Sequence, residues 1–551
     1  HRAAVGPQSV QHERPHGRTN AKDVHVQCRC DHCSRSPVAC ASDRRAPRPQ
    51  DRDVPEALAA SHAYGAAPTP NDGVAMVMPI QDALFLLAEA REKPMHVGGL
   101  QLFRMPEGAD PGTLGQLYRS SLEHGGVHPK LARRPVRNLA LAGAWGWEND
   151  DHLDLEYHVR HSSLPYPGRI RELLALVSRL HGTLLDRNRP LWEAHLIEGV
   201  EDNQFAIYTK IHHALVDGVA ATKLLEAALS LDPARTDMPP PWAAPEGYLE
   251  ARSQRAAQKA QEREGGQSGL LGAMTVAVGA ATGAVGATLG GARSVTGASV
   301  NGLKSVVKSF QDEAAALPYK APRSALNVPI TGARRFVAQS YDLGRLAGVR
   351  KATGATLNDV VLAMCAGALR GYLLEMDALP TDPLISMVPV SLRQDDDDVE
   401  SGNQVGVILC NLATHLEDPE ARLRLIMRSM TEGKLSLKGL DAAGTMLLSA
   451  ISFAPLGLGP LFRFEALRKP PFNIVISNVP GPREKLYWRG NELLGTYPLS
   501  ILTDGQACNI TVTTYNGSLE FGILGDRTAL PSLQRMIDHL ENALLELEKL
   551  S

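Results

Sequence analysis

Two stretches in which strand-like and helix-like segments alternate constrain this chain most. They cover residues 76–231 and 325–551, and such alternation predicts α/β layered structure in each. Residues 232–324 between them differ, with a proline-rich stretch, a charged helix candidate and an uncharged Gly/Ala-rich segment. A chain of 551 residues is too long for one simple core. We therefore expect two α/β halves joined by a linker.

The first 75 residues have a different character. They are rich in Arg, His, Pro and Ala and lack apolar periodicity, which predicts a disordered extension over residues 1–75. A cluster of possible metal ligands lies within it: Cys28, Cys30, His32, Cys33 and Cys40. Its spacing does not match the paired cysteines of zinc sites, so we expect no metal there. No apolar core of the signal-peptide kind is present, which favours a reducing, cytoplasmic setting.

Charge and hydrophobicity narrow the possible partners. The formal net charge is −3, from 57 basic and 60 acidic residues, which argues against a general nucleic-acid binder. The uncharged segment within residues 265–292 is long enough to span a bilayer. It is rich in Gly, Ala and Thr and only weakly hydrophobic, so packing between domains or peripheral lipid contact is the preferred interpretation.

Local patterns predict several elements. An apolar face formed by Ala83, Leu84, Leu87 and Ala88 predicts a helix that Pro94 ends. The other expected elements are strands at "HVGGLQLF", "PLISMVPVSL" and "NQVGVILCNLAT", a capped helix at "LNDVVLAMCAGALRGYLLEM", a hairpin turning at Asn516-Gly517, and a last helix with an apolar stripe that includes Met536 and Leu540.

The segment "KIHHALVDGVAATKLL" holds adjacent histidines, His212 and His213, followed by Asp217 and Gly218. A strand is expected before them and a helix after them, and α/β folds often place functional groups at such turns. Period-two alternation places His213 on the more apolar face of the strand, and His212 shares the other face with Lys210. His213 is therefore the predicted interior histidine.

Chemistry alone leaves several roles open for this segment. A histidine takes a proton near neutral pH, Asp217 is suited to accept a hydrogen bond or pair with an arginine, and Gly218 tolerates backbone conformations denied to other residues. The alternative is a pair of hydrogen-bonded core histidines. A metal pair is disfavoured, because no third ligand is evident and the HExxH pattern is absent.

The string "HHALVDG" resembles the HHxxxDG signature shared by acyl-coenzyme A-dependent acyltransferases and peptide-synthetase condensation domains. Further strings together resemble the bacterial wax ester synthase/diacylglycerol acyltransferase family, in its order over residues 78–548: "MHVGGLQLF", "LDLEYHVRHSSLPYPG", "LLDRNRPLWEAHLIEG", "LNDVVLA", "PVSLR" and "SNVPGP". The resemblance implies two chloramphenicol acetyltransferase-like subdomains with an active-site tunnel between them.

It also implies a chemistry. His213 would be the general base, and His212 would orient or pack. Fatty acyl-coenzyme A would be the donor substrate, with no cofactor and no acyl-enzyme. The acceptor would be diacylglycerol, giving triacylglycerol, or a long-chain alcohol, giving a wax ester. Such substrates imply an enzyme in the cytoplasm that associates peripherally with a membrane or lipid-droplet surface.

Supporting residues come from other strings. Asn358 and Asn478 are candidates for stabilising an oxyanion, with helix capping and turn formation as their alternatives. Asp217 is expected to have a structural role with Arg393 as its ionic partner, and Trp192 is a candidate tunnel residue or a core residue. Arg334 and Arg335 are either near the coenzyme A entrance or a solvated basic pair.

Two other functions compete with this one. A condensation-type HHxxxDG enzyme would form amides from carrier-bound thioesters, but no carrier or adenylation module is visible beside it. A non-catalytic lipid-binding or lipid-droplet protein is the second alternative, and the intact His213 and Asp217 favour catalysis over it.

Overall fold

The protein was analysed as a computed structural model. It describes residues 76–110, 112–124, 126–138, 143–216, 218–244, 320–391, 405–438 and 469–551. All of these belong to one unit, residues 67–551. The predicted extension over residues 1–75 and the Gly/Ala-rich segment of the linker lie outside the described residues.

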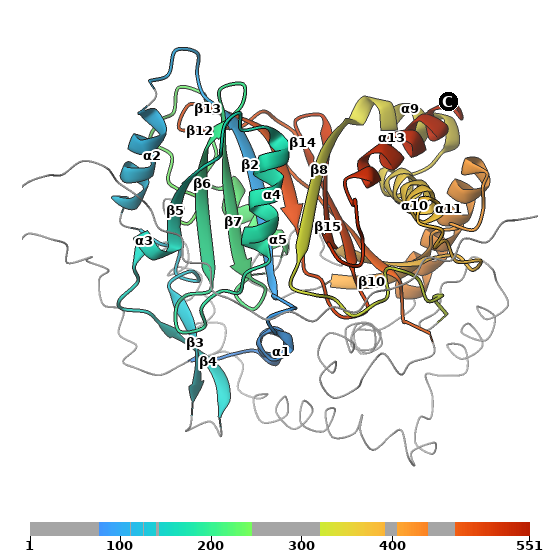
Figure 1. Cartoon of the computed structure of the whole chain (residues 1–551), viewed down its shortest axis with the longest axis horizontal. Helices are drawn as coiled ribbons and strands as arrows, with labels where there is room; N and C mark the ends of the chain where they lie inside the picture. The colour runs from blue at the N-terminus through green and yellow to red at the C-terminus, as the bar shows by residue number, and fades with distance from the viewer. Residues whose placement is uncertain are drawn as a thin grey trace, which may run out of the picture. The chain divides into compact units, whose positions relative to one another are not determined.

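The first half builds most of a six-stranded sheet with the order β12-β13-β2-β7-β6-β5 (Figure 1). Its strands are β2 (His96–Arg104), β5 (Val159–Ser163), β6 (Trp192–Val200), β7 (Gln204–His212), β12 (Tyr487–Trp488) and β13 (Asn491–Leu499). The strand predicted at "HVGGLQLF" is thereby confirmed as β2. Strand β7 is antiparallel to both neighbours, β2 and β6, so it is internal to the sheet.

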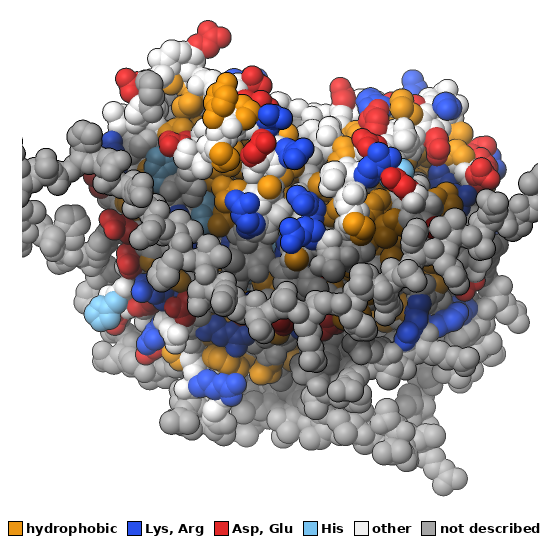
Figure 2. Space-filling view, in the orientation of Figure 1, with side chains coloured by type: hydrophobic (Ala, Val, Ile, Leu, Met, Phe, Trp, Pro, Cys, Tyr) orange, Lys and Arg blue, Asp and Glu red, His pale blue; other side chains and the backbone are white. Residues whose placement is uncertain are grey.

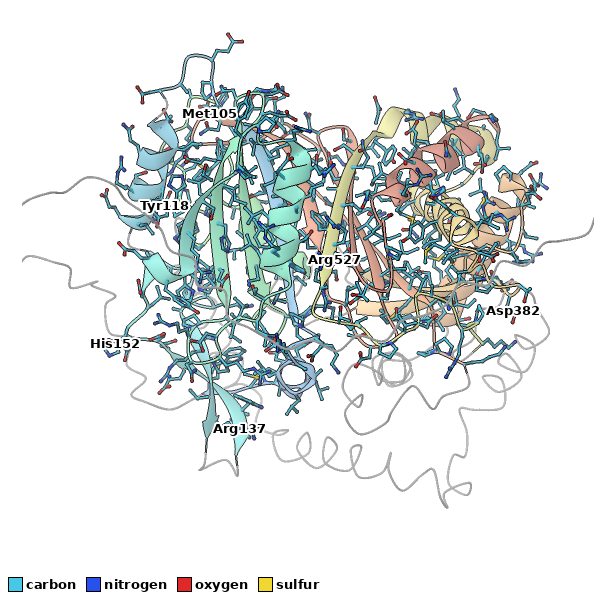
Figure 3. The ribbon with its side chains drawn as sticks, viewed as in Figure 1. Met105, Tyr118, Arg137, His152, Asp382 and Arg527 are labelled. Atoms are coloured by element: carbon cyan, nitrogen blue, oxygen red, sulfur yellow. The ribbon has the colours of Figure 1, made fainter. Side chains whose placement is uncertain are left out.

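Among the described residues, the first half also contains five helices and a small sheet. The helices are α1 (Ile80–Ala88), α2 (Thr113–Leu122), α3 (Leu155–His158), α4 (Ile170–His181) and α5 (Gly218–Glu226). The small sheet has the order β1-β4-β3, from β1 (Met76–Val77), β3 (Arg133–Asn138) and β4 (Ala144–Asn149). Figure 3 shows the β3–β4 hairpin, which carries Arg137, extending away from the larger sheet.

Helix α1 forms where the sequence predicts it, but it ends at Ala88 rather than at Pro94, and of the predicted face only Ala83 and Ala88 pack inward. Leu86 is buried, whereas Leu84 is 37% and Leu87 is 53% exposed. The segment is apolar at most positions, so spacing alone does not distinguish its faces. The neighbouring cluster of Met78, Trp147 and Trp192 determines which face of α1 is buried, because Leu86 packs into that cluster.

The second half forms another six-stranded sheet, with the order β10-β9-β11-β14-β15-β8. Its strands are β8 (Arg334–Asp342), β9 (Ile385–Ser391), β10 (Val405–Asn411), β11 (Ile474–Val479), β14 (Cys508–Tyr515) and β15 (Ser518–Asp526). The strands predicted at "PLISMVPVSL" and "NQVGVILCNLAT" are confirmed as β9 and β10. The predicted hairpin is confirmed too, since Tyr515 pairs with Ser518 across Asn516-Gly517.

Helices α9 (Leu343–Thr353), α10 (Leu357–Glu375), α11 (Pro419–Lys438) and α13 (Arg535–Glu548) gather beside this sheet (Figure 1). Thr356 caps α10 in a reciprocal capping box with Asp359, as a polar N-terminus predicts. In α13 the expected stripe buries Met536, Leu540 and others. Among the described helices, α10 is long and apolar enough to cross a membrane by length and composition, but most of it is buried as core.

The second half of the chain contributes two strands to the first sheet. Strands β12 and β13 lie within the second half of the sequence, yet β13 pairs with β2 and both strands complete the first sheet. Helix α4 of the first half also contacts β8 of the second, where Ser178 Oγ accepts the Phe336 N–H at 2.8 Å. Described charged side chains of both signs are interspersed over the face drawn in Figure 2.

Candidate functional site

Strand β7 ends at His212, and its burial corrects the alternation argument. Tyr208, Lys210 and His212 share one face and are each 0% exposed. Because both faces of this internal strand are covered, polarity does not tell the inner face from an outer one. His212, not His213, is the sealed histidine, and His213 lies in the turn beyond the strand and is half-buried.

His213 is held by an aromatic ring and a backbone contact. Its imidazole stacks on Phe85 of α1, with ring centroids 4.1 Å apart and 15° between planes. Its backbone N–H donates to the Met95 carbonyl at 2.8 Å. The stacking fixes the orientation of the imidazole, and the side chain stays partly exposed, as a proton-transfer group requires.

His212 lies between the loop and a buried carboxylate. Its Nδ1 accepts the Ala214 N–H at 3.1 Å, and its Nε2 lies 3.4 Å from Glu89 Oε1. Glu89 directly follows α1, and its Oε2 accepts two hydrogen bonds from Arg187 at 3.0 and 3.1 Å. Neither Glu89 nor Arg187 was among the predicted site residues. Their signals were an acidic residue ending an apolar helix and an arginine within "LLDRNRPLWE".

The turn after the histidines is only partly described. Asp217 and Arg393 lie outside the described residues, so their expected ion pair stays a prediction. Gly218 begins α5, the helix expected after the motif. Gly99 of β2 lets this helix approach, because a Cβ there would lie 2.8 Å from Leu225.

Asn358 and Asn478 meet in the second half. Asn478 Nδ2 donates to Asn358 Oδ1 at 3.5 Å, a long contact. Neither holds the structural role weighed for it, because Thr356 caps α10 and Asn478 lies within β11, paired with Val512. Two amides that the sequence places far apart are therefore neighbours.

Trp192 has the contacts of a core residue. It is 2% exposed, its Nε1 donates to the Leu131 carbonyl at 2.8 Å, and it stacks on His158. These contacts agree with the alternative that Trp192 is a core residue.

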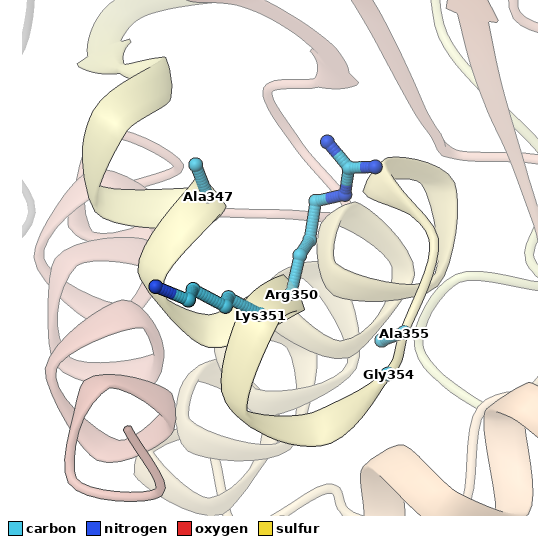
Figure 4. Close-up of a pocket in the computed structure, with 5 residues that line it drawn as sticks. All are labelled: Ala347, Arg350, Lys351, Gly354 and Ala355. Atoms are coloured by element: carbon cyan, nitrogen blue, oxygen red, sulfur yellow. The ribbon is translucent and has the colours of Figure 1, made fainter.

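Arg334 and Arg335 were considered either for the coenzyme A entrance or as a solvated pair, and Arg335 is half-buried. Arg334 is buried rather than solvated, lies 3.7 Å from Asp526 and donates to the Glu92 carbonyl at 2.6 Å. Burial lowers its pKa to about 10. A separate hollow of about 300 Å³ is lined by Arg350 and Lys351 (Figure 4), but all its lining comes from α9 and the residues just after it. No predicted site residue lines it.

A second buried polar cluster lies on the sheet beside the histidines. Glu193 of β6 pairs across the strands with Lys210, 3.2 Å from its ammonium, and lies 3.4 Å from His195 and from Arg160. Burial acts to raise the pKa of Glu193, but the His195 hydrogen bond and the charges of Lys210 and Arg160 outweigh it and lower the pKa to about 2. Glu193 is therefore ionised at neutral pH.

The fold places the chain among the acyl-coenzyme A-dependent acyltransferase-like structures. A starter condensation domain of rhizomide synthetase matches with a TM-score of 0.50 at 12% identity, covering 86% of this chain and 94% of that one, which is a likeness of fold alone. The wax ester synthase/diacylglycerol acyltransferase from Marinobacter aquaeolei VT8 matches with a TM-score of 0.65 at 41% identity, covering 86% and 99%.

Sequence comparisons define the family. The wax ester synthase/diacylglycerol acyltransferase catalytic domain matches residues 78–361, and the C-terminal domain of the same family matches residues 401–548. The O-acyltransferase WSD of Acinetobacter baylyi is 42% identical over 84% of this chain and 95% of that protein. A Mycobacterium tuberculosis protein, provisionally named a diacylglycerol O-acyltransferase, is 46% identical over 85% and 98%. This chain belongs to the wax ester synthase/diacylglycerol acyltransferase family and is an O-acyltransferase.

Proposed function

We propose that His213 is the general base for transfer of a fatty acyl group from acyl-coenzyme A to the hydroxyl of diacylglycerol or a long-chain alcohol. The observation that carries this proposal is the contrast between the neighbours: His212 is sealed, whereas His213 is half-buried at the end of the internal strand. The printed names of the family and its relatives support the donor and acceptor classes.

The reaction balances without a covalent enzyme intermediate. His213 takes the proton of the acceptor hydroxyl as its oxygen bonds to the thioester carbonyl carbon. The tetrahedral intermediate collapses, the C–S bond breaks, and the coenzyme A thiolate takes the proton from protonated His213. The described cysteines fit this route, because burial raises the pKa of Cys410 and Cys508 to about 12 and also raises that of Cys365. Such thiols are poor nucleophiles at neutral pH.

Asn358 and Asn478 are our candidates for stabilising the oxyanion of that intermediate. An amide N–H is a suitable donor to a developing negative charge. Their contact supports action as a pair, since one amide orients the other. Asp217 and Arg393 are proposed to brace the turn after His213.

Acceptor choice is tested with purified protein and labelled palmitoyl-coenzyme A, offered diacylglycerol or hexadecanol in parallel. We expect labelled ester with at least one acceptor and its loss in His213→Ala. Ester formation that persists in His213→Ala rejects the base assignment. Binding of acyl-coenzyme A without turnover by the unaltered protein favours the lipid-binding alternative.

Peripheral contact with a membrane or lipid droplet completes the proposal. Large apolar side chains are exposed on β1 and α1, namely Met76 at 49%, Val77 at 59%, Leu84 at 37% and Leu87 at 53%. Strand β1 pairs with β4, and the exposed Arg137 of the adjacent β3 lies 4.6 Å over the ring of Trp145 on β4. Apolar, tryptophan and cationic side chains together suit an anionic lipid surface. Since α1 also carries Phe85, this surface is one helix away from His213.

Leu87→Glu tests this surface, with Leu374→Glu as its control, because both leucines are 53% exposed. A charge on α1 opposes insertion into lipid, so we expect flotation with phosphatidylcholine/phosphatidylglycerol vesicles to fall several-fold for Leu87→Glu only. Equal flotation of both variants and the unaltered protein would reject α1 as the contact.

A further inference from the structure

Helix α1 contacts both histidines of the motif through residues one turn apart. Phe85 stacks on His213, and Glu89 Oε1 lies 3.4 Å from His212 Nε2. Positions separated by four residues in or just beyond a helix project to the same side. The helix and the residue just after it therefore contact both histidines, although only His213 is partly exposed.

The hydrogen bonds of His212 determine where its proton lies. Nδ1 accepts the Ala214 N–H at 3.1 Å, so this nitrogen presents its lone pair. The proton of the neutral ring is then on Nε2, which lies 3.4 Å from Glu89 Oε1, within ion-pair distance but outside hydrogen-bond geometry among the described residues. Reversing this tautomer would place two N–H groups against each other at Ala214.

Glu89 is itself fixed as an anion. Its side chain is 2% exposed, and Arg187 donates to its Oε2 at 3.0 and 3.1 Å. Burial acts to raise its pKa, but His212, the Met95 N–H and Arg187 together outweigh burial and lower it. The carboxylate is thus ionised at neutral pH, and its negative charge 3.4 Å from His212 Nε2 favours the Nε2–H form of that ring.

A second path joins Glu89 to the base through the backbone. The Met95 N–H donates to Glu89 Oε1 at 3.1 Å, and the Met95 carbonyl accepts the His213 N–H at 2.8 Å. The carboxylate therefore anchors the residue that holds the backbone of His213, as well as the ring of its neighbour.

We propose that Glu89 is a positioning residue for catalysis, which holds His212 in its Nε2–H tautomer and thereby fixes the turn that aims His213 at the acceptor hydroxyl. This inference rests on the proposed role of His213. Glu89 does not touch the substrate; it acts through His212 and Met95. Its role predicts a loss in kcat with little change in the KM for acyl-coenzyme A.

Glu89→Gln is the test, because it preserves shape and removes the charge. Misplacing a base by about 1 Å costs on the order of 10²-fold in rate, so we expect kcat to fall roughly 10- to 100-fold while KM for palmitoyl-coenzyme A changes less than about twofold. Glu193→Gln is the matched control. Glu193 is also buried and also lies 3.4 Å from a histidine, but it contacts neither motif histidine among the interactions described. We expect its kcat per folded molecule to stay within about threefold.

A double-variant cycle separates positioning from general destabilisation. If Glu89 acts through His212, Glu89→Gln has a much smaller effect in a His212→Gln background than in the unaltered enzyme. Multiplying effects, or a Glu89→Gln kcat within twofold of the unaltered value, would overturn the inference. His213→Ala, assayed in parallel, reports separately on the base assignment, because its retention of activity would reject the proposed function itself.

Discussion

Two buried glutamate–histidine pairs lie on neighbouring parts of this enzyme. They differ in what the second ring nitrogen of each histidine contacts. Glu89 with His212 and Glu193 with His195 have the same 3.4 Å separation, and their carboxylates are 2% and 7% exposed. His212 Nδ1 accepts a backbone N–H of the motif turn. Among the residues that the structure describes, His195 Nε2 hydrogen-bonds Glu193 while its Nδ1 has no partner, and His212 Nε2 has no partner of hydrogen-bond geometry. The Glu89–His212 pair is thus connected to the motif turn through Ala214, whereas the described contacts of the Glu193–His195 pair lie only within its sheet cluster.

The charges around the pairs differ as well. Glu193 faces Lys210, which is fully buried, whereas Glu89 faces Arg187, which is 37% exposed. Removing a carboxylate leaves a desolvated cation in the first case and a cation with access to water in the second. We therefore expect the Glu193 cluster to matter more for stability and the Glu89 cluster more for catalysis.

The largest expected effect separates the histidines. His213→Ala removes a general base and should lower kcat/KM by about 10² to 10⁴-fold. His195→Gln alters the sheet cluster and should leave kcat/KM per folded molecule within about threefold. Initial rates with palmitoyl-coenzyme A, normalised to the folded fraction from circular dichroism, measure both. Comparable losses in the two variants would show that the clusters are not functionally distinct.

Stability should rank the glutamates in the opposite order. Glu193→Ala leaves Lys210 as an uncompensated buried charge and should lower the free energy of unfolding by about 3–5 kcal/mol. Glu89→Ala should cost about 1–3 kcal/mol, because Arg187 regains water. Urea denaturation at neutral pH measures both values. A greater loss for Glu89→Ala would contradict the comparison.

Acid should weaken the Glu193 cluster over a defined window. The pKa of Glu193 is about 2 against an ordinary value of 4.5, so its folded-state ionisation contributes stability above pH 4.5 that is lost as the pH falls toward 2. This difference corresponds to about 3 kcal/mol. Urea midpoints of the unaltered protein should fall more steeply between pH 5 and 3 than those of Glu193→Gln. Parallel slopes would show that Glu193 does not carry this dependence.

Several elements were predictable because residues close together in the sequence determine them. Asn516-Gly517 forms the expected hairpin turn, and both residues have positive φ, at 42° and 81°. The α10 cap likewise follows from neighbouring residues, Thr356 and Asp359. In both cases the interactions that form the structure lie within a few positions of the pattern.

The failures have the opposite cause. Alternation along β7 chose the wrong histidine as the interior one, since this strand is covered on both faces. The buried face of α1 depends on a cluster drawn from other elements. Glu89 and Arg187 meet only in the folded molecule. The family strings identified the motif, but the partners of His212 required tertiary structure.

The strand β13 also bears on how this protein is made. Because β12 and β13 complete the first sheet beside β2, that sheet lacks two strands until residue 499 has left the ribosome. Until then β2 presents unpaired backbone groups, the kind of edge that invites pairing between nascent chains. A fragment ending at residue 244 would keep that edge permanently. Production of the motif-bearing half alone should therefore yield aggregates, and both six-stranded sheets are finished only once β15 has been made.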